Sequence, residues 1–351
     1  MSVKQIGWLA LAGVLLLIGA ATARSAENTR ALLSPEAQLE VDLSFLLANS
    51  ELDPDYLPTL LGGLLNPGKP TALQELMKDR NPIAVKAFDD LYYIGLPFVG
   101  TWALNTRDGI ILWDALDNAD EAEHILVPKM KQLGLDPARI KYLIVTHGHF
   151  DHYGGAKYLQ DTFHPRVLMG AADWQMIANP PGEFKAWPQP PPPRHDLDVV
   201  DGQELTLGGK TVRLYITPGH TPATVSSIIP TTFHGRPHVV AFWGGNGMPT
   251  SLAATDSTGG LIAYREQLFR FTRLGIKQHV DAVISNHPVV DGTIRKAKLM
   301  ATLRPDEANP WVVGESTFIR IMGSNIAAMN AGIIEARRKI PANAPAANKD
   351  P

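Results

Sequence analysis

The chain has 351 residues and a formal net charge of −3; 45% of its residues are hydrophobic and 19% are charged. This balance is typical of a globular protein with a sizeable core, and it excludes the strongly basic surface that binds nucleic acid or an anionic membrane. The absence of cysteine excludes disulfides, thiolate metal ligands, a cysteine nucleophile and a lipoprotein anchor. We therefore expect a small molecule as the partner.

The N-terminus has the outline of a secretory signal peptide. Lys4 precedes an apolar run from Ile6 to about Ala23, after which Arg24 begins a polar stretch. Ala21-Thr22-Ala23 supplies a small-residue cleavage pattern, so cleavage is expected after Ala23, with Ala26 as the alternative. An uncleaved membrane anchor is the competing interpretation, because the run approaches the length of a membrane span. Removal of residues 1–23 would leave a periplasmic or secreted protein with no stable membrane span.

Residues 24–94 are expected to form a helical extension ahead of the main domain. Ser34-Pro35-Glu36 has the pattern of a helix start, and leucines follow at helical spacing. A second helix is predicted from about Thr71 to Leu91, interrupted by Asn81-Pro82, and prolines and glycines separate the two helices. The extension is interpreted as an arm that covers the core. The alternative is that its Leu-rich middle forms a lid or a dimer surface, and the oligomeric state stays open.

A hairpin, a helix and a buried strand follow in order. Alternation and β-branching over Phe98–Asp114 predict two strands joined by a turn at Arg107–Gly109. An amphipathic helix is predicted from Ala119 to Gly134, and the apolar run Tyr142–Val145 predicts a buried strand. Asp114 stands at the end of its strand, where position alone indicates a strand-end cap.

Four candidate metal ligands follow the buried strand within six positions: His147, His149, Asp151 and His152. The two histidines at i and i+2 point to one side of extended backbone, and Tyr153-Gly154-Gly155 then lets the chain turn into a helix. Imidazole nitrogen and carboxylate oxygen are ligands of zinc and similar divalent ions. A loop of solvated histidines would not explain this density, so the stretch predicts a metal site.

The second half of the chain contains one unusual loop. Residues 178–196 are rich in proline, which excludes regular secondary structure, and the aromatic Trp187 within them suggests a wall of a substrate pocket. Other pocket candidates on nearby loops are Trp102, Met248, Thr250 and Ser251. The elements predicted beyond the loop are a hairpin (Glu204–Leu207 with Thr211–Ile216), a strand pair (Val225–Ile229 with Val239–Trp243), a helix (Gly259–Leu274), a strand (Asp281–Ser285), a C-terminal helix (Ser324–Lys339) and a disordered tail (341–351).

Two further histidines complete a recognisable pattern. His220 lies in the segment Thr217–Pro222 and His287 follows a predicted strand. Together with His147-x-His149-x-Asp151-His152, these motifs resemble the signature of the metallo-β-lactamase fold superfamily over about residues 90–300. The resemblance implies an α/β fold, a four-layer αββα sandwich over residues 95–340, with a metal centre at one edge between two sheets. It also implies that Asp114 orients a metal-bound histidine.

The resemblance divides the ligands between two ions. His147, His149 and His220 would hold one, and Asp151, His152 and His287 the other. Three protein ligands leave an open position on each ion, as a catalytic zinc site requires. A hydroxide shared by the two ions would be the nucleophile, and Asp151 would orient it and pass on a proton. Two zinc ions per chain are expected from the nitrogen-rich ligands, although iron or manganese would tolerate similar ones.

One departure from the family pattern concerns Asn246. Many members place an aspartate that bridges both ions where this chain has Trp243–Gly247, and Asn246 is a neutral amide at that position. This arrangement is similar to the third subclass of di-zinc metallo-β-lactamases. Asn246 could donate to a developing oxyanion, which makes it a second catalytic candidate beside Asp151; it could equally be a turn residue among glycines.

The resemblance, together with the signal-peptide pattern, therefore implies an exported di-zinc hydrolase that opens an amide or ester bond, with β-lactams first among its substrates. A lactonase or esterase on the same metal centre is the alternative. A metal-binding scaffold that keeps the fold without the chemistry is the non-enzymatic alternative, and the presence of all six ligands disfavours it.

Overall fold

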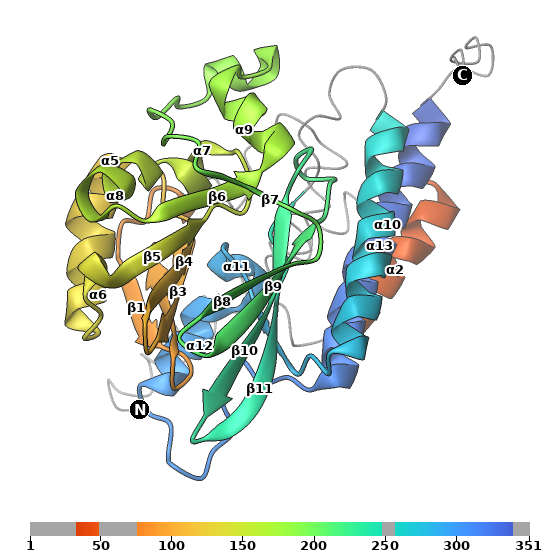
Figure 1. The fold of residues 1–351 in the computed structure, drawn as a ribbon. Helices are drawn as coiled ribbons and strands as arrows, with labels where there is room; N and C mark the ends of the chain where they lie inside the picture. Colours follow the sequence, from red (N-terminus) through yellow and green to blue (C-terminus); the bar gives the residue numbers. More distant parts are fainter. Residues whose placement is uncertain (1–32, 49–75, 248–256, 340–351) are drawn as a thin grey trace, which may run out of the picture.

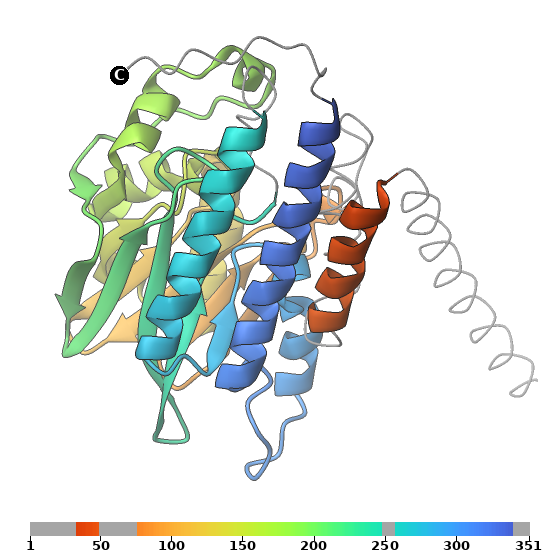
Figure 2. The same ribbon diagram turned by 90° about the vertical axis from the view of Figure 1, so that its right-hand side faces the viewer.

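The computed structural model describes residues 33–48, 76–247 and 257–339 of the chain, and two stacked β-sheets form its framework (Figures 1 and 2). The predicted signal peptide and C-terminal tail lie outside these residues. Among the described helices, none is both long and apolar enough to cross a membrane.

The first sheet has seven strands in chain order: β1 (Ile83–Lys86), β2 (Leu91–Gly95), β3 (Gly100–Thr106), β4 (Gly109–Trp113), β5 (Ile140–Ile144), β6 (Arg166–Gly170) and β7 (Leu197–Val199). Strands β1 to β4 pair antiparallel, whereas β4 to β7 run parallel. Since parallel strands end at the same edge of a sheet, the residues after β4, β5 and β6 lie together.

The second sheet has five strands in the order β12 (Ala282–Ile284), β11 (Arg236–Phe242), β10 (Val225–Phe233), β9 (Lys210–Ile216) and β8 (Gln203–Leu207). All neighbours are antiparallel except β11 and β12, which run parallel. The segments that follow β11 and β12 therefore leave the sheet at one edge. The hairpins predicted around residues 107–109, 208–209 and 234–235 are confirmed.

The space between the sheets holds the largest aromatic side chains. Trp102, Trp113 and Phe242 are almost completely buried there. The indole of Trp102 donates to the carbonyl oxygen of Ser285 at 2.7 Å, and that of Trp113 to Ser227 Oγ at 3.0 Å. Buried indoles need such acceptors, so these bonds join the two sheets as well as filling the core.

Helices cover the outer face of each sheet, which confirms the predicted αββα sandwich (Figures 1 and 2). The helices against the seven-stranded sheet are α5 (Ala119–Glu121), the π-helical turn η1 (Ala122–Leu126), α6 (Val127–Gln132) and α8 (Ala156–Phe163). Those against the five-stranded sheet are α10 (Ser257–Lys277), α13 (Glu315–Lys339) and α2 (Pro35–Ala48). Shorter segments are η2 (Pro137–Arg139), α7 (Phe150–Tyr153), α9 (Ala171–Ala178), η3 (Gly182–Ala186), α11 (Pro288–Asp291) and α12 (Thr293–Met300).

The N-terminal extension is only partly helical. Helix α2 is confirmed, and it packs on α13 through Ser44, whose hydroxyl donates to the carbonyl oxygen of Ser324 at 2.8 Å. The helix predicted up to Leu91 is wrong, because β1 and β2 occupy that region and begin the first sheet before residue 95. Pro82 interrupts the helical pattern, and the β-branched and aromatic residues after it favour strands. The Leu-rich middle, residues 49–75, lies outside the described residues.

Two other boundaries differ from prediction. Helix α13 begins at Glu315, nine positions before the predicted start at Ser324. The Pro-rich loop contains the short 3₁₀ segment η3, although the rest of it is irregular as expected. A 3₁₀ turn tolerates a proline-rich context because it spans few residues.

Candidate metal centre

The six candidate ligands meet at the edge where strands of both sheets end. His147 and His149 follow β5, Asp151 and His152 lie on α7, His220 lies between β9 and β10, and His287 follows β12. All six side chains are buried, and they form two sets. We call His147, His149 and His220 the histidine group, and Asp151, His152 and His287 the aspartate group. Within each group the possible ligand atoms lie within 4.8 Å of one another.

The spacing in the histidine group fits a divalent cation. Nδ1 of His149 lies 3.1 Å from Nε2 of His147 and 3.1 Å from Nε2 of His220. A ring nitrogen carries one hydrogen or one lone pair, so ordinary hydrogen bonding satisfies only one of these contacts well. Ligands at about 2.0–2.1 Å from a tetrahedral zinc would be about 3.3 Å apart, which is close to the spacing observed.

The histidine group is neutral in this environment. Burial lowers the pKa of His147 and of His220 well below the usual range, and it lowers the pKa of His149 to about 3. Metal binding requires the unprotonated imidazole. The three rings are therefore held in the form that binds a cation.

Backbone carbonyls fix the orientation of two ligand rings. Nδ1 of His147 donates to the carbonyl oxygen of Gly244 at 2.9 Å, and Nδ1 of His287 donates to that of Phe98 at 2.8 Å. A carbonyl can only accept, so it assigns the hydrogen to Nδ1 and leaves the Nε2 lone pair of each ring facing the centre. Such bonds are the usual support of a metal-binding histidine.

The aspartate group carries charge. Oδ2 of Asp151 lies 3.2 Å from Nε2 of His152 and 3.7 Å from Nε2 of His287. Nδ1 of His152 donates to Oδ2 of Asp114 at 2.8 Å. Burial disfavours the imidazolium, yet Asp151 and Asp114 raise the pKa of His152 to about 10. In the absence of a cation, a protonated His152 thus offsets one of the two buried negative charges.

Asp114 organises the aspartate group from behind. It is fully buried directly after β4, with a φ of 64°, a left-handed conformation that is disfavoured for a non-glycine residue. Besides His152, it accepts from the backbone N of Thr146 at 2.7 Å, from the Thr146 hydroxyl at 2.9 Å and from Asn286 Nδ2 at 3.2 Å. The predicted contact between Asp114 and a candidate ligand histidine is present, and its carboxylate also joins the β5 and β12 ends.

Asp173 supports the histidine group as Asp114 supports the aspartate group, and the sequence did not predict this role of Asp173. Its carboxylate accepts from the backbone N of Gly148 at 2.9 Å, from the Thr221 hydroxyl at 2.6 Å and from the backbone N of Ala223 at 2.9 Å. Gly148 separates two ligand histidines and Thr221 follows the third. Asp173 therefore holds together the two loops that carry this group. An acidic residue in the first turn of a short helix is common, so the sequence contains no signal for this role.

Asn246 lines the cavity beside the centre, but its amide nitrogen bonds to other acceptors. Its Nδ2 contacts three acceptors, at 3.2 Å from the carbonyl oxygen of Trp243 and at 3.0 Å from both Ser285 Oγ and Asn286 Oδ1. An amide nitrogen has two hydrogens, so this network uses both. The predicted oxyanion donor is thus not available in this arrangement. Asn246 instead ties the end of β11 to the end of β12.

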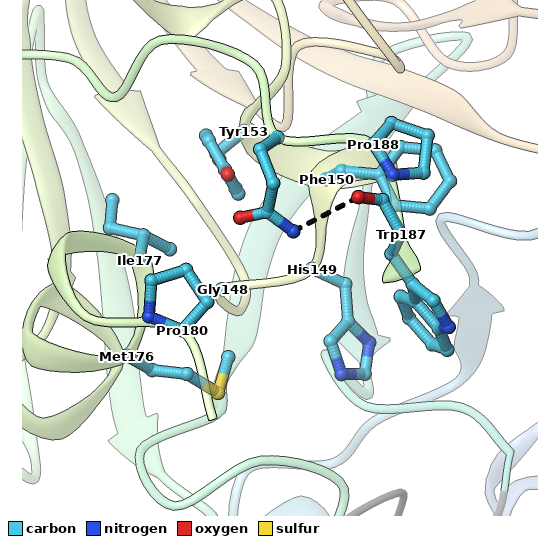
Figure 3. A pocket seen from close by; sticks show the side chains of 10 residues that line it. Gly148, His149, Phe150, Tyr153, Met176, Ile177, Pro180, Trp187 and Pro188 are labelled. Carbon is cyan, nitrogen blue, oxygen red and sulfur yellow. Dashed lines mark hydrogen bonds between the residues drawn. The ribbon is translucent and has the colours of Figure 1, made fainter. Parts of the chain in front are cut away.

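A cavity of about 860 Å³ opens onto both groups, and its walls include Met77, Phe98, Phe150 and Trp187. The Trp187 ring lies 5.3 Å from the His149 ring and 6.0 Å from the Phe150 ring. Figure 3 shows the three side chains at the pocket wall. The Pro-rich loop is therefore a wall of the cavity, as predicted. Trp102 is not, because it lies in the core between the sheets. Met248, Thr250 and Ser251 lie outside the described residues.

Comparisons with known proteins agree with this architecture. Residues 95–232 match the family model described as the metallo-beta-lactamase superfamily. A hydroxyacylglutathione hydrolase of Acidiphilium cryptum is 34% identical over 88 residues, which are 25% of this chain and 30% of that protein. The chain thus spans less than a third of that relative's length.

Solved structures extend the likeness to most of the fold. The subclass B3 metallo-beta-lactamase BJP-1 of Bradyrhizobium japonicum superposes with a TM-score of 0.61 at 21% identity, covering 70% of this chain and 92% of that one. The FEZ-1 metallo-beta-lactamase from Legionella gormanii gives a TM-score of 0.62 at 19% identity, covering 73% and 96%. At such identities the likeness concerns the fold alone. Residues 95–232 thus match the metallo-beta-lactamase superfamily model, and the described part of the chain has the fold of the metallo-beta-lactamases.

Proposed function

We propose that this protein is a metal-dependent hydrolase whose histidine group and aspartate group each hold one zinc ion. The observation that carries the proposal is the convergence of Nδ1 of His149 with two other imidazole nitrogens at 3.1 Å, in a buried site beside a second set of ligands. Nitrogen-rich ligands favour zinc among the common divalent ions. A scaffold without chemistry would not need the large cavity that opens onto both groups.

When bound, the metal ions would polarise a carbonyl group and lower the pKa of a bound water molecule towards neutrality. Asp151 is the residue of the chain suited to move the proton. Burial favours its neutral acid, but His152 and His287 hold the pKa of its carboxyl well below the usual range. Asp151 would therefore be ionised, orient the attacking water and take up its proton. His147 and His287, each fixed by a backbone carbonyl, would keep the ligand geometry rigid.

Two substrate classes compete. Hydrolysis of β-lactams is the first candidate, since the neutral amide of Asn246 leaves no bridging carboxylate, as in the third subclass of these enzymes. Hydrolysis of lactones or other esters is the second, and the apolar walls formed by Met77, Phe98, Phe150 and Trp187 favour it. Both reactions use the same ligands and the same proton transfer.

We also propose that the protein acts outside the cytoplasm after cleavage behind Ala23. This proposal rests on the signal-peptide pattern of residues 1–23. Cell fractionation and N-terminal sequencing of the purified protein test this point. A mature N-terminus at Arg24 is expected, and an intact Met1 in the membrane fraction would contradict it.

The central experiment measures metal content and turnover together on the purified chain. Zinc at two ions per chain, with chelator-sensitive opening of a penicillin, a carbapenem or a lactone, is the expected result. Turnover of lactone alone selects the second substrate class. A chain that takes up no metal from zinc-supplemented buffer would overturn the proposal, as would turnover that survives the change of His147 to alanine.

A further inference from the structure

The cavity above the metal centre has an unusual charge. Its described lining contains two charged side chains besides the histidines, Asp151 at its floor and Asp117 on its wall, and neither lysine nor arginine. Building on the proposed hydrolase function, we propose that this cavity selects neutral or cationic substrates over anionic ones, with Asp117 as the residue that rejects a negative charge. This selection favours the lactone or ester class over penicillins and carbapenems, whose carboxylate is negatively charged.

The apolar part of the wall indicates which uncharged groups of a substrate the cavity can bind. Phe150 and Trp187 lie beside the ligand His149 (Figure 3), and Phe98 lies 5.2 Å from the ring of the ligand His287. Met77 completes the wall. Such a surface is suited to bury the hydrocarbon part of an acyl or alcohol group that flanks the reacting carbonyl.

The carboxylate of Asp117 is incompletely compensated by the groups around it. Its Oδ1 is buried and has no hydrogen-bond partner among the described residues, and its Oδ2 lies 4.0 Å from the guanidinium of Arg80. That guanidinium forms its closer bond with Glu121, whose side chain is 3% exposed. Two carboxylates thus share one cation, so the negative charge of Asp117, which lines the cavity, is only partly compensated.

Asp117 is ionised at mildly alkaline pH. Burial and the neighbouring carboxylates of Glu121 and Asp151 raise its pKa to about 7, so an assay at pH 8 examines the charged form. Cations bound by the two ligand groups would lie at the cavity floor, where they hold the reacting group. A charged substituent farther along the substrate would meet the wall instead, where Asp117 is the charged side chain of the described lining.

The test compares matched ligands rather than unrelated substrates. Three hydroxamic acids share the same metal-binding head and chain length, and end in a tert-butyl, a trimethylammonium or a carboxylate group. Their affinities for the zinc-loaded protein are measured by calorimetry at pH 8. We expect the neutral and cationic ligands to bind about tenfold or more tightly than the carboxylate ligand, because a like charge at contact range is repelled in a partly buried site.

The variant Asp117→Asn isolates the residue responsible. It should strengthen binding of the carboxylate ligand by about fivefold to tenfold and change binding of the tert-butyl ligand less than twofold. Asp120→Asn is the matched control, since Asp120 is 83% exposed on the adjoining helix, and it should change none of the three affinities.

Every outcome decides the question. Equal or tighter binding of the carboxylate ligand by the unaltered protein overturns the charge selection, as does an unchanged preference in Asp117→Asn. None of these results bears on the proposed hydrolase function, which stands or falls with zinc content and chelator-sensitive turnover.

Discussion

The histidine group and the aspartate group are alike in geometry, but they differ in the charge of their side chains and in the hydrogen bonds that hold those side chains in place. The histidine group contains three neutral imidazoles, and its buried aspartate, Asp173, bonds the loops on either side of the ligands. The aspartate group contains a carboxylate, and its buried aspartate, Asp114, bonds a ligand ring directly.

Asp114 and Asp173 therefore illustrate two ways of supporting a candidate metal site. Asp114 sets the hydrogen position and basicity of His152, so it acts on the electronic state of one ligand. Asp173 accepts from two backbone N–H groups and one hydroxyl, so it acts on the spacing of two loops. Changes to the first should alter metal affinity chemically, and changes to the second should alter it through geometry and stability.

The largest effect should come from removing one ligand of each group. His147→Ala and His152→Ala should each lower turnover by about 1,000-fold or more, because several kcal/mol of transition-state stabilisation depend on an intact centre. Metal analysis should find one zinc ion retained in each variant, in opposite groups. Retention of two ions in His147→Ala would contradict the assignment of the histidine group.

The next effect concerns the pH dependence of stability. Burial raises the pKa of Asp173 from 3.8 to about 6, so its native form binds a proton more readily than its unfolded form. Its contribution to stability is complete below about pH 4 and is lost as the pH rises through 6, by about 3 kcal/mol. Relative to Asp173→Asn, the wild type should therefore lose stability between pH 4 and pH 7 in chemical denaturation without metal.

Asp196 provides a control of opposite sign. Its carboxylate also accepts a backbone N–H, from Val167 at 3.0 Å, and a side-chain amide, from Gln160 at 2.8 Å, but its pKa is lowered because these bonds outweigh its burial. Relative to Asp196→Asn, the wild type should gain stability as the pH rises from the acid range. The same sign for both variants would refute the linkage argument.

Changing Asp114 should weaken one group selectively. Asp114→Asn keeps the size of the side chain but removes the charge that supports His152, so zinc affinity of the aspartate group should fall by about 10–100-fold. Competition titration with a chromophoric chelator resolves the two binding steps. The histidine group should bind as before, and an equal loss in both steps would show that Asp114 supports the loops rather than the ligand.

The smallest effect is expected from Thr221→Val, which removes one donor to Asp173. A lost hydrogen bond to a buried carboxylate should cost about 1–2 kcal/mol of stability and weaken zinc binding by a few-fold in the histidine group alone. Thr206→Val is the control, because Thr206 pairs with Thr211 at an exposed position. Comparable losses of stability and of zinc affinity in both variants would contradict a specific role for the hydrogen bond between Thr221 and Asp173.

Local signals in the sequence were sufficient for much of the fold. Turns such as Arg107–Gly109 and the run Tyr142–Val145 depend on residues adjacent in the chain, and the corresponding strands formed where predicted. Strands β1 and β2 were missed because both of their faces are covered or partly covered, which removes the alternation that distinguishes a strand from a helix.

The sequence by itself determined which residues converge at the candidate metal centre, since four candidate ligands lie within six positions and the other two lie in loops after strands. Only the tertiary structure decided what surrounds them. Asp173 acts across 48 positions on Thr221, and Asn246 is turned towards Asn286, 40 positions away. Asp117 acquires its role by lining the same cavity as Trp187. Such contacts depend on burial and on packing between distant segments, and neither leaves a local pattern in the chain.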